Sequence, residues 1–282
     1  MMRQPRAGSR YRTRRRGVLL HSVASLVVAT WLFPLAYVIV SSFKPAELFG
    51  RNFIAWVFSP TLEHYRFVLV ESAYPRELAN SIVVSLGAMI LSVGIGTLAG
   101  YSLARFKTGG KNLAMWFLGS RIMPPAAVLI PFFVMFNRLG IIETRFVLIL
   151  SYMVFNLSFV VWMSRSFFLE VPVELEEAAM VDGSTRLQAF WGITLALSRT
   201  GIMATIIFSL IFSWNEYLFA TVLTNSDAAR TLPAGVGKFL THYQIVWGPL
   251  FAESTLIIFP VLLAGMILQR HLIRGITMGA LK

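Results

Sequence analysis

The chain has 282 residues, of which 56% are hydrophobic and only 13% are charged. Soluble domains carry about 25% charged residues, so this composition indicates a multi-spanning membrane protein. The formal net charge is +12, but arginines cluster between Arg3 and Arg16, beside an apolar run, which favours a cytoplasmic anchor over nucleic-acid binding. The sequence contains no cysteine, which excludes disulfides, thiolate metal sites and cysteine nucleophiles.

Six apolar stretches are long enough to cross a bilayer, which takes about 20 residues. They cover residues 18–43, 80–104, 112–136, 145–168, 201–224 and 250–270. The basic segments between alternate stretches predict that both termini lie in the cytoplasm. We therefore expect an all-α integral membrane protein with a basic cytoplasmic N-terminus (1–17), a first span (18–43), an extracytoplasmic loop (44–79), a core with five further spans (80–273) and a cytoplasmic tail (274–282).

The second stretch is rich in small residues, and Gly96 and Gly100 form a Gly-x-x-x-Gly pair. Such pairs allow two membrane helices to approach closely. We expect these glycines to serve helix packing rather than to line a pore.

The third stretch is interrupted by Met123-Pro124-Pro125. Two consecutive prolines remove backbone donors and clash with the preceding turn. We expect one helix to end near Met123 and a shorter segment to continue to Phe136. The freed carbonyl groups require surrounding protein or a water-filled cavity.

Residues 170–200 form an acidic interruption between two apolar runs. Five of the thirteen carboxylates lie between Glu170 and Asp182, so we expect this segment to lie in water. Pro172 suits the first position of a helix, where its missing N–H costs nothing. Gly183 is expected to end that helix.

A second helix is predicted to follow this glycine, because Thr185 and Gln188 can form a capping box. On the first helix, Leu175, Ala178 and Ala179 share one face at i, i+3, i+4 spacing. This small apolar face suits insertion into another protein's groove or packing on the chain's own bundle, whereas the acidic character argues against a helix lying on anionic lipid headgroups. Periodicity alone does not decide between the two.

Glu177-Ala178-Ala179, with Gly183 after three further residues and Ile193-Thr194-Leu195 after nine more, resembles the EAA loop of bacterial binding-protein-dependent ABC importer permeases. That motif usually ends in Leu-Pro, and Ala196 replaces the proline here. Other matches are similar to the carbohydrate branch of the family, specifically its maltose-type second permease. They are Asn80-Ser81, Met123-Pro124, Ile130-Pro131, Leu139-Gly140, Trp214-Asn215-Glu216 and residues 269–279. The resemblance implies six transmembrane helices in the MetI-like fold of type I ABC importers.

The resemblance also implies how the chain is driven, because the EAA loop of that family docks on a cytoplasmic ATPase. Glu177, Ala178, Ala179 and Gly183, with Leu175 on the same face, would make this contact to an ABC ATPase dimer. The other implied partners are a second, unlike permease that completes a heterodimer, an extracytoplasmic solute-binding protein and membrane lipid. The implied function is ATP-driven import of a sugar, oligosaccharide, sugar alcohol or sugar derivative across a bacterial inner membrane by alternating access.

The sequence shows no catalytic site of its own. A P-loop needs G-x-x-x-x-G-K-[ST], which Gly109-Gly110-Lys111-Asn112 and Gly237-Lys238 do not match. It contains neither a His-Glu-x-x-His metal motif nor a plausible Ser-His-Asp arrangement. We therefore expect no enzyme activity, no metal and no cofactor in this chain, with ATP and Mg on the partner ATPase.

The candidates for the solute path are Arg121, Asn215 and Glu216, which are polar residues within spans, and the adjacent Trp214. Asn215 and Glu216 follow Trp214 near the outer end of the fifth span, and ionisable groups at such depth cost about 2.5–3.5 kcal/mol. Substrate contact and structural hydrogen bonding are both open for them. Arg121 would attract an anionic sugar if it faced a cavity, or would pair with Glu253 if it faced a neighbouring helix, and the structural role is favoured.

Three alternatives remain open from the sequence. The chain could be an ABC permease for a non-sugar solute, an ion-coupled secondary transporter or an assembly factor without a solute path. The broken third span fits a secondary transporter, but no clear internal repeat is visible and six spans are few.

Overall fold

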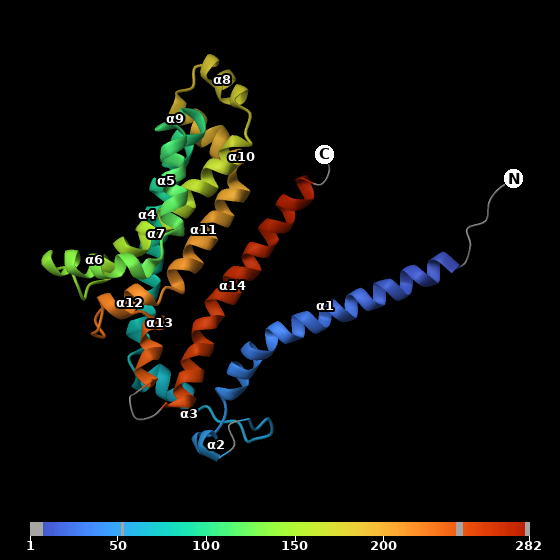
Figure 1. The fold of residues 1–282 in the computed structure, drawn as a ribbon, viewed down its shortest axis with the longest axis vertical. Helices are drawn as coiled ribbons and strands as arrows, with labels where there is room; N and C mark the ends of the chain where they lie inside the picture. Colours follow the sequence, from blue (N-terminus) through green and yellow to red (C-terminus); the bar gives the residue numbers. More distant parts are fainter. Residues whose placement is uncertain (1–7, 52–53, 241–244, 280–282) are drawn as a thin grey trace.

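The structure, a computed structural model, describes residues 8–51, 54–240 and 245–279 and is built from helices (Figure 1). The longer helices are α1 (Gly8–Ser41), α4 (Tyr74–Arg105), α5 (Gly110–Ile122), α6 (Pro125–Arg138), α7 (Arg145–Leu169), α11 (Arg199–Trp214) and α14 (Trp247–Gly279). The shorter ones are α2 (Ala46–Arg51), α3 (Glu63–Arg66), α8 (Val173–Val181), α9 (Arg186–Ala189), α10 (Leu195–Leu197), α12 (Leu218–Leu223) and α13 (Leu232–Gly235), with the turns η1 (Phe67–Glu71), η2 (Phe190–Thr194) and η3 (Val236–Phe239). Within the described ranges no strand occurs, and the all-α prediction is confirmed.

Four helices are long and apolar enough to cross a membrane, and two bent pairs bring the number to six. The four lie at Leu20–Ser41, α4, α7 and Trp247–Ile267. The bent pairs are α5 with α6, at 92°, and Arg186–Leu197 with α11, at 81°. Three helices extend well beyond their predicted spans: α1 begins at Gly8, in the predicted N-terminal segment, α4 begins at Tyr74, and α14 continues to Gly279, into the predicted tail. Residues 1–7 of the predicted N-terminus and 280–282 of the tail lie outside the described residues.

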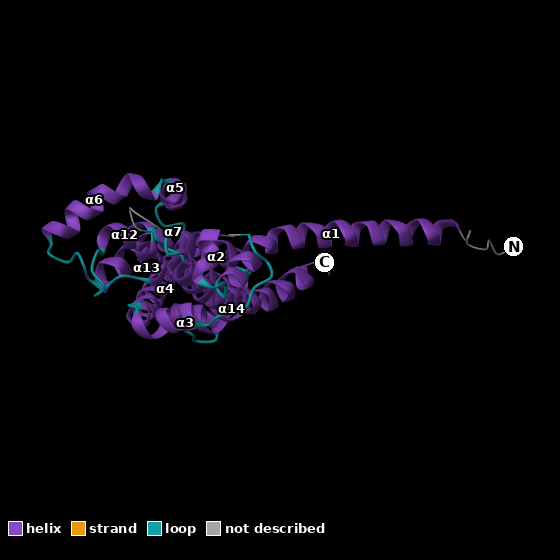
Figure 2. Ribbon diagram, turned by 90° about the horizontal axis from the view of Figure 1, so that it is seen from below, coloured by secondary structure: helices purple, strands orange, loops and turns teal. Residues whose placement is uncertain are grey.

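The third span is broken as predicted. α5 ends at Ile122 and α6 begins at Pro125, with Met123 and Pro124 extended between them. Figures 1 and 2 show that α6 turns away from the direction of α5 and projects to one side of the bundle.

The fifth predicted span, residues 201–224, is divided in the structure. α11 ends at Trp214, and α12 is a separate short helix. The polar pair between them causes the interruption. The Asn215 amide donates to the Ile211 carbonyl at 2.8 Å, whereas the Glu216 carboxylate accepts the N–H groups that begin α12.

The glycine pair in α4 serves packing, as predicted. An added Cβ on Gly96 would lie 2.6 Å from the Val160 Cγ1 atom of α7. One on Gly100 would lie 3.0 Å from both the Arg165 amide and the Val161 carbonyl. The backbones of α4 and α7 therefore lie as close as the absence of side chains allows, and these two helices form the largest contact in the molecule.

Polar side chains fasten α11 to both of these helices. The Ser92 hydroxyl of α4 lies 3.2 Å from the Ser209 hydroxyl of α11. The Asn156 amide of α7 donates to the Ser213 hydroxyl at 2.7 Å. All four side chains are buried, so these hydrogen bonds fix the relative positions of the three helices.

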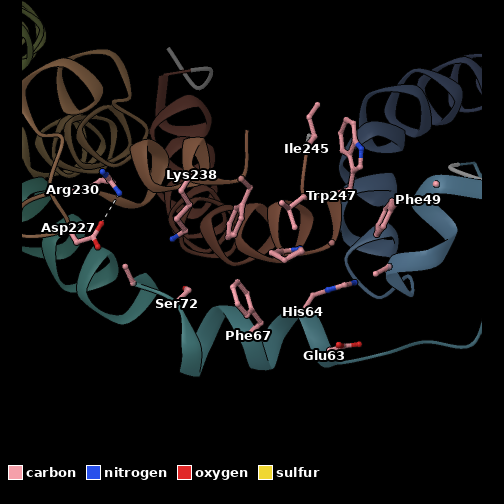
Figure 3. Close-up of a pocket in the computed structure, with 17 residues that line it drawn as sticks. Phe49, Glu63, His64, Phe67, Ser72, Asp227, Arg230, Lys238, Ile245 and Trp247 are labelled. Carbon is pink, nitrogen blue, oxygen red and sulfur yellow. Dashed lines mark hydrogen bonds and ion pairs between the residues drawn. The ribbon is translucent and has the colours of Figure 1, made fainter. Parts of the chain in front are cut away.

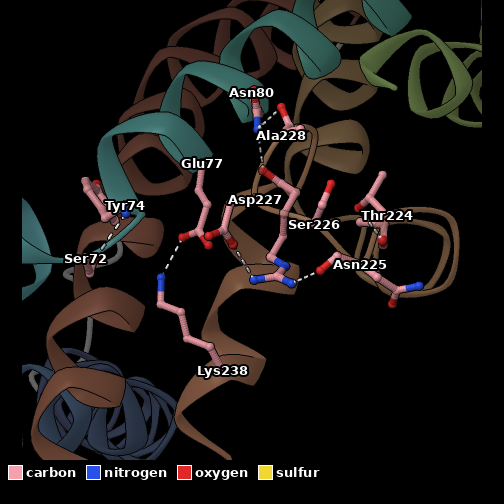
Figure 4. A network of polar contacts seen from close by, with 12 residues as sticks. Ser72, Tyr74, Glu77, Asn80, Thr224, Asn225, Ser226, Asp227, Ala228 and Lys238 are labelled. Atoms are coloured by element: carbon pink, nitrogen blue, oxygen red, sulfur yellow. Dashed lines mark hydrogen bonds and ion pairs between the residues drawn. The ribbon is translucent and has the colours of Figure 1, made fainter. Parts of the chain in front are cut away.

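A buried ion triad joins three segments at the end of the bundle opposite α8. The Lys238 ammonium of η3 lies 2.7 Å from the Glu77 carboxylate of α4 and 3.1 Å from the Glu253 carboxylate of α14. Both glutamates are fully buried. Gly235 leaves the space that Glu77 fills, since an added Cβ would lie 2.5 Å from its Oε2 atom. Figure 4 shows Lys238 reaching Glu77 within the wider polar network.

The Gly100 contact predicts that Gly100→Ala lowers the free energy of unfolding by about 1–3 kcal/mol, because α7 backbone atoms cannot move aside easily. Gly94→Ala is the matched control in the same helix, since its added Cβ meets open space. Thermal unfolding of both variants in detergent checks this. Equal stability of the two variants would contradict the packing account.

The triad predicts that Lys238→Met costs about 3–5 kcal/mol of stability, because it leaves two carboxylates buried without a counter-charge. Glu253→Gln should cost much less, since Lys238 then still pairs with Glu77 one to one. Urea or thermal unfolding of the purified variants measures the difference. A Lys238→Met protein as stable as Glu253→Gln would show that the triad does not hold these segments together.

Candidate functional site

The loop between α7 and α11 adopts a helix, a glycine corner and a second helix, as predicted. α8 ends at a Schellman motif: the Gly183 N–H donates to the Met180 carbonyl at 3.1 Å, and the Ser184 N–H donates to the Ala179 carbonyl at 2.9 Å. Gly183 has φ +94°, a conformation that strongly favours glycine.

The start of α9 agrees with its prediction, whereas the start of α8 differs from it by one residue. The capping box of Thr185 and Gln188 is present, which confirms that prediction. Pro172 is the N-cap of α8 rather than its first helical residue, because its extended ψ of 131° places it outside the helix. Its carbonyl still accepts from the Leu175 N–H.

The expectation that the whole acidic segment lies in water is wrong for Glu176, which is only 4% exposed. Its carboxylate accepts from Arg105 Nε and from the Tyr101 hydroxyl, each at 2.6 Å, and from the Thr194 hydroxyl. Arg105 also donates to the Val171 carbonyl at 2.9 Å. The end of α4 thus holds the beginning and the end of the loop through one buried carboxylate.

The same contacts set the protonation state of Glu176. Burial alone would raise the pKa of its carboxyl, but the hydrogen bonds from Thr194, Tyr101 and Arg105, with the charge of Arg105, lower it below the ordinary glutamate value. Glu176 is therefore ionised at neutral pH, and its charge is matched by Arg105.

The opposite side of α8 is exposed. Glu177 and Ala178 are exposed and Ala179 is partly exposed. Leu175 is 44% exposed and Val181 is 86% exposed. Figure 1 shows α8 projecting at one end of the bundle, so this acidic and apolar surface is open to a partner.

A cavity of about 230 Å³ lies where the bend between α5 and α6 meets the break between α11 and α12. It is lined by Arg121, Pro125, Tyr152, Phe155, Asn156, Ile211, Phe212, Ser213, Asn215, Glu216 and Phe219. Three of the four predicted path residues are brought together here. The fourth, Trp214, is buried and donates its indole N–H to the Ile257 carbonyl of α14 at 3.2 Å.

Arg121 does not pair with Glu253, and that structural alternative is wrong. Glu253 lies beside Lys238 instead. The Arg121 guanidinium lies over the ring of Phe212, 4.8 Å from its centroid, and 5.7 Å from that of Phe159. Sequence reasoning missed this because aromatic partners of an arginine leave no charge pattern.

A larger groove of about 1050 Å³ lies at the end of the molecule opposite α8. Figure 3 shows α3 on one side and the start of α14 on the other, with the charged side chains of Glu63, Asp227, Arg230 and Lys238 around it. Among the residues that the structure describes, no three His, Asp or Glu side chains are grouped as metal ligands would be.

Comparisons with known proteins agree with this architecture. The family described as "Binding-protein-dependent transport system inner membrane component" matches residues 92–278. A probable ABC transporter permease protein of Sinorhizobium fredii is 33% identical, over 89% of this chain and 91% of its own. A trehalose/maltose transport system permease protein of Thermococcus litoralis is 32% identical, over 94% and 96%. A chain from the crystal structure of a bacterial ABC transporter that imports the acidic polysaccharide alginate has a TM-score of 0.78 at 18% identity, covering 95% of this chain and 99% of that one. It confirms the predicted fold.

The Glu176 contacts predict that Glu176→Gln destabilises the protein, whereas Glu177→Gln does not. The lowered pKa means that the stabilisation is complete above the ordinary glutamate pKa and disappears as pH falls through the lower folded-state value. The stability gap between wild type and Glu176→Gln should therefore be present at pH 7 and narrow in acid. Thermal unfolding across this pH range measures it, and a gap that widens in acid would contradict the assignment.

Proposed function

The chain belongs to the family of binding-protein-dependent transport system inner membrane components, as the permease subunit of an ABC transporter, and we propose that it imports a carbohydrate. The named substrates of its trehalose/maltose relative support this class. The solute would be a sugar, an oligosaccharide, a sugar alcohol or a sugar derivative. It would enter the cytoplasm by alternating access.

The observation that carries the proposal is the two-sided loop at α8. Glu176 ties one side to α4 through buried contacts, while Leu175, Glu177 and Ala178 leave the other side exposed. A short amphipathic helix of this kind fits a groove on a partner protein. The partner would be a cytoplasmic ABC ATPase dimer, which binds ATP and Mg. Movement of the ATPase would shift α8, and the buried contact between Glu176 and Arg105 would transmit that shift to α4.

Contact of α8 with a cytoplasmic ATPase would set the orientation of the chain in the membrane. In Figure 1, α1 projects away from the side of the bundle, and α14 ends toward the end of the molecule that carries α8. The arginines before Gly17 favour the cytoplasm for the N-terminus. Both termini would then be cytoplasmic, and the groove beside Glu63 and Arg230 would face an extracytoplasmic solute-binding protein.

A second, unlike permease would complete the path. Apolar side chains on α1, α5 and α6 are left uncovered, among them Trp31 at 77%, Ile122 at 75% and Ile130 at 73% exposure. Lipid suits the apolar faces, but the exposed Arg121 beside Ile122 requires water or a protein partner. The cavity at the broken spans would therefore lie at the boundary between the two permeases.

Co-purification and transport assays test the proposal together. An ATPase and an unlike permease should copurify with the tagged chain, and proteoliposomes with the complex should take up sugars only when ATP is supplied. A homo-oligomer with ion-coupled uptake would overturn the proposal.

The coupling contact predicts that Gly183→Val and Glu177→Ala lower ATP-driven uptake by about tenfold or more while membrane abundance stays normal. A side chain at φ +94° costs about 1–2 kcal/mol and shifts the corner. Gly192→Ala is the matched control, because its Cβ meets no atom within 4 Å. Normal uptake by both loop variants would exclude this surface as the coupling site.

A further inference from the structure

Arg121 lies at the cavity where two interruptions of the membrane helices meet. It is in the last turn of α5, next to the 92° bend with α6, and the break between α11 and α12 lines the same cavity. Irregular backbone is tolerated at membrane depth only where it is buried in protein or lines a water-filled space. Transporters commonly place their solute sites at such discontinuous helices.

The guanidinium is held in position but few of its donors are used. The rings of Phe212 and Phe159 flank it, and its Nη1 atom donates to the Phe155 carbonyl at a long 3.4 Å. Arginine has five N–H donors in a planar fork. This fork matches a carboxylate or a phosphate with two parallel hydrogen bonds, and an aromatic stack keeps it oriented.

The charge of Arg121 has no counter-charge within the described residues, where no carboxylate forms an ion pair with it. Glu216 lines the same cavity, but its two oxygens accept the N–H groups of Phe219 and Ala220 at 3.1–3.3 Å. These hydrogen bonds hold the Glu216 carboxylate at the start of α12, and it forms no ion pair with Arg121. The Arg121 guanidinium therefore has N–H donors available to a solute.

We propose that Arg121 binds the anionic group of a charged carbohydrate, a carboxylate, sulfonate or phosphate, as the solute passes this cavity. The inference rests on the proposed function and narrows its substrate class. Phe155 lines the same cavity, and its partly exposed ring offers apolar surface to the face of a sugar ring. At about 230 Å³ the cavity is smaller than the roughly 300–1,000 Å³ of whole-ligand pockets, so it suits one charged sugar unit.

The test compares probes that differ only in charge. The assembled transporter in proteoliposomes is supplied with a glucuronate-containing disaccharide, a sulfonated glucoside and the matching neutral glucosides. Wild type should import an anionic probe, and Arg121→Gln should lower that uptake by about tenfold or more, as loss of a charge-assisted hydrogen bond predicts. Arg121→Lys should restore it in part. Uptake of any neutral probe and ATP hydrolysis without solute should stay within about twofold.

Arg138→Gln is the control, because this exposed arginine at the end of α6 lies outside the cavity. If Arg121→Gln is not inserted, Phe212→Leu decides, since it keeps the charge but removes the ring beside it. A raised KM for the anionic probe alone supports the inference, and an unchanged KM overturns it.

The remaining outcomes separate the two proposals. Import of neutral probes only, or equal loss of both probe classes in Arg121→Gln at normal abundance, overturns the anion site and leaves the carbohydrate permease standing. Import of no carbohydrate by wild type overturns the proposed function, and the anion site with it.

Discussion

The buried ion pair between Glu176 and Arg105 is the interaction on which the connection between α8 and the helix bundle depends. The Glu176 carboxylate is ionised, fully hydrogen-bonded and paired with Arg105, so it holds α8 against the end of α4. A buried charge is stable only when such partners surround it, and losing one partner leaves the charge uncompensated. The loop is therefore held firmly on the bundle, so a displacement of α8 would also displace the end of α4.

The rest of the molecule is suited to transmit that motion. The glycine contact at Gly100 brings α4 and α7 to backbone distance, and Asn156 fastens α7 to α11. At the far end, Lys238 ties α4 to α14 through two buried carboxylates. Between these fixed points, the bend between α5 and α6 meets the break between α11 and α12 at Arg121. A rigid frame around one discontinuous region fits a permease that opens alternately to its two sides.

Much of this architecture was predictable because its signals are local. The proline break, the glycine corner at Gly183 and the capping box are each specified by a few adjacent residues. The pairs that hold the structure together were not predictable, because their members lie far apart in the sequence. Glu176 and Glu177 look alike in an acidic run, and only packing against Arg105 separates them. Polar residues at 215–217 were expected near the end of a span, but that they divide it depends on how Glu216 caps α12.

The free face of α8 can be tested directly, because the chain has no cysteine and an introduced one is unique. The measurement is maleimide labelling of Ala178→Cys, with Ser226→Cys at the other end of the molecule as the control. We expect Cys at position 178 to react in the isolated permease and to be protected when the ATPase is bound, while labelling at position 226 stays the same. Equal labelling at position 178 with and without the bound ATPase would contradict the account.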